Sequence, residues 1–105
     1  MKNLINTSSS SNVKTWYDPS EVTILKRKEV CQRLNLSLNA IELRIKSGVL
    51  PPPINLGGRS VGFIKPEIDI ILSCMIGGKE AEEIKLIASE LINFRSFAVK
   101  NLALS

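Results

Sequence analysis

Residues 54–63 read INLGGRSVGF, and this stretch decides the fold because its pattern differs from that of the chain on either side. Apolar residues alternate with polar or small ones in two short runs, and Gly57-Gly58-Arg59 stands between the runs. A period of two is typical of β-strands, and glycine permits the positive φ angles that tight hairpin turns require. The stretch therefore predicts a β-hairpin that carries Arg59 at its tip.

Two helices separated by a short break are expected before the hairpin, at about Arg27 to Leu34 and about Leu38 to Ser47. Ser37 is a suitable N-cap for the second helix, and Gly48 is a suitable C-terminal stop. A short β-prone run at residues 22–25 leads into the first helix. Apolar residues recur at i, i+4 spacing on one face of each helix, namely Val30 and Leu34, then Ile41 and Ile45.

Two further helices are expected after the hairpin, at about Pro66 to Met75 and about Lys79 to Phe97. The whole pattern predicts a mainly α fold with a small β-hairpin. The order of helix, break, helix, hairpin and helix indicates a winged helix-turn-helix, followed by an extra C-terminal helix. We therefore divide the chain into a disordered tail at 1–19, a winged DNA-binding domain at 20–76 and a C-terminal helical segment at 77–105.

Composition excludes several classes of function. The 105-residue chain contains no histidine, so it lacks the commonest general base and the commonest metal ligand. Cys31 and Cys74 lie inside apolar helical patterns, where a free cysteine acts as a small buried hydrophobe. We expect no enzymatic activity, no metal and no cofactor. No apolar run approaches the roughly 20 residues of a membrane span and no signal-peptide pattern opens the chain, so a cytoplasmic protein without membrane contact is expected.

Charge is distributed unevenly along the chain. Residues 1–66 hold ten basic and four acidic side chains, a net +6, whereas residues 67–105 hold four basic and six acidic side chains, a net −2. This asymmetry is expected of a protein whose front half binds a polyanion, although a basic surface also serves solubility alone.

Residues 22–76 resemble AlpA-type phage regulators and excisionase-like proteins of the MerR-like winged class. The likeness begins with the run at 25–31 and is strongest at 56–63, followed by Glu67-Ile68-Asp69. It implies a sequence-specific DNA-binding protein of a prophage or integrative element. Such a protein acts as a transcription regulator and/or an excisionase (recombination directionality factor), with double-stranded DNA as partner and an integrase as a further candidate partner. The second helix departs from the usual basic, hydroxyl and aromatic family residues at Leu38, Asn39, Ala40, Glu42 and Leu43.

Eight residues are expected to form the DNA-binding site. The outward face of the second helix offers an amide that can pair with adenine, apolar groups for thymine methyls and an ammonium for phosphate. The start of the first helix favours a phosphate, and the hairpin tip brings a guanidinium to the neighbouring backbone or minor groove. Glu42, on the shoulder of this face, is a solvated charge, a repulsion from wrong sites or a contact to cytosine. The eight residues are Arg27, Lys28, Asn39, Ala40, Leu43, Lys46, Gly58 and Arg59.

The fourth helix carries a wide apolar stripe that must be buried against another surface. That surface is either its own domain, at Ile70 and Ile76, or a second copy of the chain. We expect self-association, which would make the protein a homo-oligomer and duplicate its small DNA-reading surface. The stripe residues expected to do this are Ile84, Ile87, Leu91 and Phe94.

A protein-interaction module is the alternative from a different class of function. It would bind and inhibit a partner protein through the C-terminal helix, helped by exposed Leu38 and Leu43. The two hypotheses differ in salt dependence, since DNA binding through several phosphates weakens steeply with salt and an apolar protein contact does not.

Overall fold

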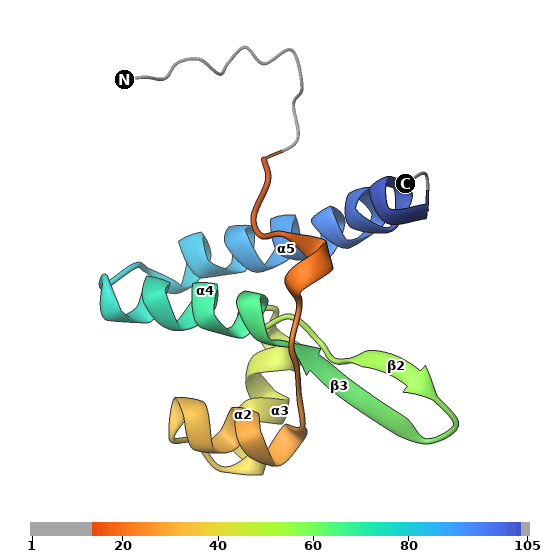
Figure 1. The fold of residues 1–105 in the computed structure, drawn as a ribbon. Helices are drawn as coiled ribbons and strands as arrows, with labels where there is room; N and C mark the ends of the chain where they lie inside the picture. Colours follow the sequence, from red (N-terminus) through yellow and green to blue (C-terminus); the bar gives the residue numbers. More distant parts are fainter. Residues whose placement is uncertain (1–13, 104–105) are drawn as a thin grey trace.

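The computed structural model describes residues 14–103, and within them four α-helices, one turn of 3₁₀ helix and a three-stranded antiparallel sheet (Figure 1). No helix in this range is long and apolar enough to cross a membrane. Most of the tail expected at 1–19 lies outside the described residues. In chain order the elements are η2 (Pro19–Glu21), β1 (Ile24–Leu25), α2 (Arg27–Leu34), α3 (Leu38–Ser47), β2 (Ile54–Gly57), β3 (Ser60–Ile64), α4 (Lys65–Ile76) and α5 (Ala81–Ala103).

Helices α2 and α3 have the bounds that the sequence predicts. The break between them starts at Asn35, whose φ of 54° ends α2 in the left-handed region. The Ser37 hydroxyl then accepts a hydrogen bond from the amide of Ala40 at 3.1 Å and caps α3. Gly48 ends α3 with a φ of 86°, which a residue with a side chain rarely adopts. Local caps therefore set the ends of both helices.

The predicted hairpin is formed by β2 and β3, and a third strand joins it. Gly57 and Gly58 have φ angles of 106° and 57°, as the tight turn requires. The β-prone entry becomes β1, which pairs antiparallel with β3 and gives the sheet order β1-β3-β2. A side chain at Gly62 would collide with Ile24 of β1, so glycine at this position lets the third strand approach.

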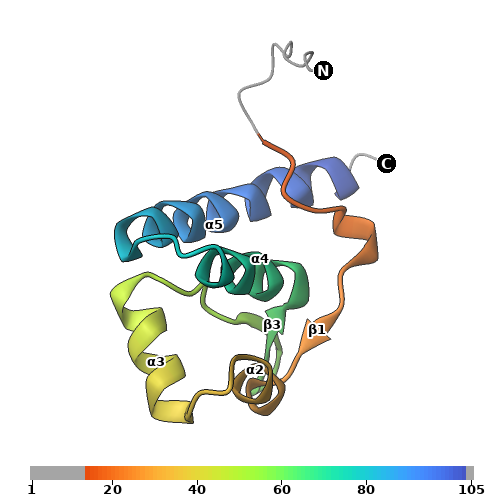
Figure 2. The same cartoon turned by 90° about the vertical axis from the view of Figure 1, so that its left-hand side faces the viewer.

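Helices α4 and α5 lie side by side and cover the upper side of the molecule in both views, with α2 on the opposite side of α4 (Figures 1 and 2). The core lies between these layers and includes Ile41, Phe63, Ile68, Ile71 and Leu91. Helix α5 begins two residues later than expected and continues to Ala103.

The apolar stripe of α5 packs inside its own chain. Leu91 is completely buried, Ile84 and Phe94 are buried, and Ile87 is half-buried against the core. Of the two residues named for the intramolecular alternative, Ile70 packs against the core, whereas Ile76 is 78% exposed. Self-association through the stripe stays a prediction, and it would require α5 to leave the surface that it covers here.

A buried ion pair joins α5 to the rest of the fold. Glu67 of α4 is only 1% exposed, and Arg95 of α5 donates to both of its carboxylate oxygens at 2.7 and 2.9 Å. Arg95 also donates to the carbonyl of Pro52 at 2.7 Å, just before β2. The Tyr17 hydroxyl donates to the same carboxylate at 3.3 Å, and burial together with the Glu67 charge raises the pKa of Tyr17 to about 12. This cluster holds four separate segments together.

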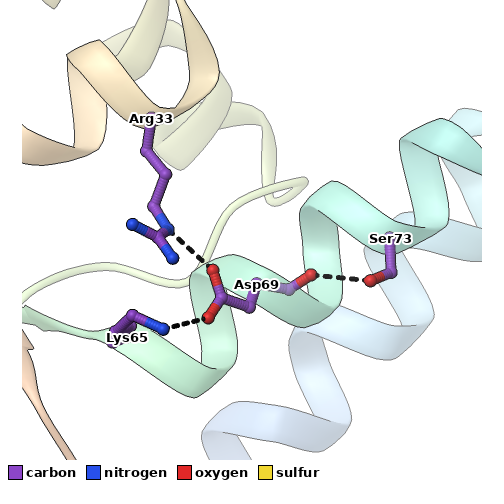
Figure 3. A network of polar contacts seen from close by, with 4 residues as sticks. All are labelled: Arg33, Lys65, Asp69 and Ser73. Atoms are coloured by element: carbon purple, nitrogen blue, oxygen red, sulfur yellow. Dashed lines mark hydrogen bonds and ion pairs between the residues drawn. The ribbon is translucent and has the colours of Figure 1, made fainter.

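An exposed polar network joins α2 to α4 (Figure 3). The Asp69 carboxylate accepts hydrogen bonds from Arg33 Nε and Lys65 Nζ, both at 2.7 Å, and Ser73 donates to the Asp69 carbonyl at 3.0 Å. Desolvation opposes ionisation of Asp69, but the bonds from Arg33 and Lys65 outweigh it and lower its pKa below the usual 3.8. Arg33 and Lys65 are thus committed to internal contacts.

Candidate nucleic-acid interface

The outward face of α3 is built as the helical rotation predicts. Burial of Ile41 fixes the orientation of the helix and leaves Asn39, Leu43 and Lys46 exposed, whereas Ala40 is half-buried. Leu43 is 65% exposed, so its apolar side chain is accessible to another molecule. A shallow hollow of about 490 Å³ lies on this face and is lined by Asn39, Glu42, Leu43, Ile45 and Lys46.

The two basic residues at the start of α2 differ in their surroundings. Lys28 is exposed and has no ion pair within the described residues. Arg27 is half-buried and forms an ion pair with Glu42 of α3, and its guanidinium carbon lies 5.6 Å from the centroid of the Phe63 ring. The structure therefore presents Lys28 to solvent but holds Arg27 against the domain, which the sequence did not predict.

The tip of the β2–β3 hairpin projects away from the helices (Figure 1). The Asn55 side chain accepts a hydrogen bond from the amide of Gly57 at 2.8 Å and supports the turn. Arg59 follows Gly58 at the tip, is exposed, and has no ion pair among residues 14–99. Leu56, which is 50% exposed, stands at the base of the tip. The turn thus carries one cation without an acidic neighbour.

Ion pairing separates the basic side chains into two groups. One group has carboxylate partners and lies mostly outside α3 and the hairpin: Arg27, Arg33, Lys65, Lys79, Lys85 and Arg95. The other group has no carboxylate partner within the described residues and lies at the start of α2, on α3 and at the hairpin tip. These residues, called the unpaired cations below, are Lys26, Lys28, Arg44, Lys46 and Arg59. (Lys14, near the end of the described range, instead lies over Trp16.)

Sequence reasoning missed two ion pairs, one at this surface and one buried between α4 and α5. Arg27 and Glu42 are 15 residues apart, and Glu67 and Arg95 are 28 residues apart. Neither pair has the i, i+4 spacing by which a single helix reveals an ion pair in sequence. Only the packing of α2 on α3, and of α5 on α4, brings these charges together.

The fold and this surface define a small, mostly helical protein whose unpaired cations lie on or next to two short helices and a hairpin. Residues 23–70 match a family model described as "Prophage CP4-57 regulatory protein (AlpA)". This part of the chain, a little under half of its length, is therefore similar to the AlpA family of prophage regulatory proteins, in agreement with the resemblance. The match contains α2, α3 and the hairpin, and it ends within α4. No curated protein and no solved structure shows significant similarity to the chain.

Proposed function

We propose that the protein is a sequence-specific DNA-binding regulator of a prophage or integrative element, in which α2 and α3 act as a helix-turn-helix and the β2–β3 hairpin acts as a wing. The observation that carries this proposal is the grouping of the unpaired cations around α3 and the hairpin tip. Elsewhere, most described cations have carboxylate partners. Leaving cations together without carboxylates costs repulsion, which a polyanionic partner would relieve.

Each part of the proposed surface has a chemical role that fits duplex DNA. The exposed face of α3 would enter the major groove, where the Asn39 amide can pair with adenine and Leu43 and Ala40 can meet thymine methyls. Lys46 and Lys28 would contact phosphates, the latter beside the N-terminal amides of α2. Arg59 would reach the adjacent backbone or minor groove, with Gly58 serving the turn.

The salt dependence of binding tests the proposal directly. Fluorescence anisotropy of a labelled duplex is measured between about 50 and 200 mM salt, and engagement of the five unpaired cations gives a slope of log K against log salt of about −4.5. A slope near zero would exclude contact through several phosphates. As the matched control, Lys79→Ala removes a cation that is paired with Glu83 and should leave the slope unchanged.

The residues on the exposed face of α3 also predict which bases are preferred. It offers an amide and apolar groups near its N-terminal end, and Arg44 lies on its half-buried side. The preferred half-site should therefore be A·T-rich at its core, since guanine is most often read by an outward arginine. Selection from a random duplex pool decides the matter, and G·C enrichment at the core would show that α3 reads DNA in another orientation or not at all.

Regulation and excision use the same DNA contacts but different partners. An excisionase would bind an attachment site cooperatively with an integrase and bend the DNA, whereas a transcription regulator would bind a promoter by itself. Footprinting of the attachment site and of the integrase promoter, with and without integrase, separates the two roles. Binding that an integrase strengthens at the attachment site alone supports the excisionase role.

A protein-interaction function is the second candidate, and exposure of two leucines on α3 favours it. Leu38 is 52% exposed and Leu43 is 65% exposed, beside the hollow on the same helix. The route through α5 is less favoured, because Leu91 and Phe94 are buried in the chain itself. An apolar contact through α3 would be nearly independent of salt, so the salt titration above also tests this candidate.

A further inference from the structure

We propose that Glu42 is a specificity-determining residue, which holds Arg27 away from DNA phosphates and so weakens binding to duplexes of arbitrary sequence. This inference rests on the proposed DNA-binding function. It begins from the position of Glu42 on α3, because the other charged side chains of this helix, Arg44 and Lys46, are positive.

Glu42 lies within the surface proposed to meet DNA. It is three residues after Asn39 and four before Lys46, so the three side chains share one side of α3. They also line the same hollow, and the Glu42 side chain is 50% exposed. A carboxylate at this position would repel phosphates if it had no partner.

The partner of Glu42 comes from another helix. Spacing of i, i+4 would allow Glu42 to pair with Lys46, yet the structure pairs it with Arg27 at the start of α2. Arg27 also lies over the Phe63 ring, so contacts from α3 and β3 hold its guanidinium against the domain. Lys46 is thereby left without a carboxylate partner and remains exposed.

The Arg27–Glu42 ion pair affects the affinity of this surface for different DNA sequences to different extents. For Arg27 to reach a phosphate, the pair must break and leave a carboxylate facing polyanionic DNA. A site that offers Glu42 a donor, such as the N6 amine of adenine, compensates for this loss. A site without such a donor does not, so Glu42 acts against arbitrary sequences more than against the preferred one.

Replacing Glu42 by its neutral isostere tests the inference. Glu42→Gln removes the repulsion and releases Arg27, so affinity for an arbitrary duplex at about 0.1 M salt should rise roughly tenfold, with a slope steeper by about one. Glu90→Gln is the matched control, because it changes net charge equally but lies on α5, outside this surface. It should change affinity less than twofold. Thermal melting of all variants confirms that they are folded.

A double variant separates release of Arg27 from loss of a charge. Arg27→Gln combined with Glu42→Gln should lose the added slope, because the released guanidinium is what contacts the extra phosphate. Equal effects of Glu42→Gln and Glu90→Gln would overturn the inference, and so would a double variant that keeps the added slope. Failure of the DNA-binding proposal looks different, since the wild-type protein itself would then show no steep salt dependence.

Discussion

The α4–α5 layer and the α2–α3–hairpin region use the same type of residue in opposite ways. Arg95 of α5 donates to two carboxylate oxygens and a backbone carbonyl, and its partner Glu67 is almost fully buried. Arg59 of the hairpin is exposed and has no carboxylate partner in the described part of the chain. The comparison shows that an arginine stabilises the fold where the chain supplies acceptors, and becomes available to a ligand where it supplies none.

The comparison first predicts a large difference between neighbouring residues of α5. Leu91 is 0% exposed and Ile92 is 39% exposed. Leu91→Asp would bury an unpaired charge and should cost more than about 4 kcal/mol in the free energy of unfolding, whereas Ile92→Asp should cost less than about 1 kcal/mol. Urea denaturation followed by circular dichroism measures both. Similar costs at the two positions would show that α5 does not pack as described.

The Leu91→Asp variant also tests the prediction of self-association. If α5 serves a second copy of the chain, the wild-type protein at roughly 100 µM should sediment as a dimer or larger, since this exceeds the Kd of most specific dimers. Leu91→Asp should then give a folded monomer. If the stripe serves only its own chain, the wild-type protein sediments as a monomer and Leu91→Asp unfolds it.

Breaking the buried ion pair should have the next largest effect. Glu67→Gln leaves Arg95 partly buried without its countercharge and should destabilise the protein by about 3 kcal/mol. Glu82→Gln is the matched control, because Glu82 pairs with Lys85 at the surface, 3.7 Å away, and its loss should cost less than about 1 kcal/mol. Equal losses in urea denaturation would contradict a structural role for the buried pair.

Arg59→Ala tests an arginine that has no carboxylate partner in the described part of the chain. It should leave the free energy of unfolding unchanged within about 0.5 kcal/mol, because the side chain is exposed. Affinity for duplex DNA should fall roughly tenfold at 0.1 M salt, and the salt slope should become shallower by about one. A gel-shift titration measures both quantities, and unchanged affinity would remove the hairpin from the binding mechanism.

The raised pKa of Tyr17 predicts how the free energy of unfolding responds to alkaline pH. Its pKa in the folded protein is raised from 10.0 to about 12, so the neutral hydroxyl is favoured in the folded state. The stabilisation is fully present below pH 10 and is lost as the pH rises towards 12. Tyr17→Phe should remove this part of the pH dependence. A melting curve that declines equally in the wild-type and variant proteins over this range would contradict the assignment.

The lowered pKa of Asp69 predicts the smallest effect, a loss of folding stability at acid pH. Because its pKa in the folded protein lies below the usual 3.8, its stabilisation is fully present above that value and is lost as the pH falls through the lower one. The contribution should stay below about 1 kcal/mol, since the contacts with Arg33 and Lys65 are partly exposed. Asp69→Asn should flatten the acid limb of the stability profile measured by urea denaturation.

Local signals account for most of what the sequence predicts correctly. Ser37 and Gly48 mark the ends of α3, and the glycines at 57 and 58 mark the hairpin, because caps and turns depend on a few adjacent residues. The pairing of β1 with β3 was not predicted, since two residues of β-prone sequence do not specify a partner strand 40 residues away. The ion pairs of Arg27 and Arg95 were missed for the same reason, because they depend on how helices pack.

Chemical-shift mapping tests the central claim most directly. Uniformly labelled protein is titrated with a short duplex at low salt, and backbone amide shifts are followed residue by residue. We expect the largest changes at the start of α2, along the exposed face of α3 and at the hairpin tip around Arg59, with small changes along α5. Changes concentrated on α5, or none at any duplex concentration, would contradict the assignment of the unpaired cations as a DNA-binding surface.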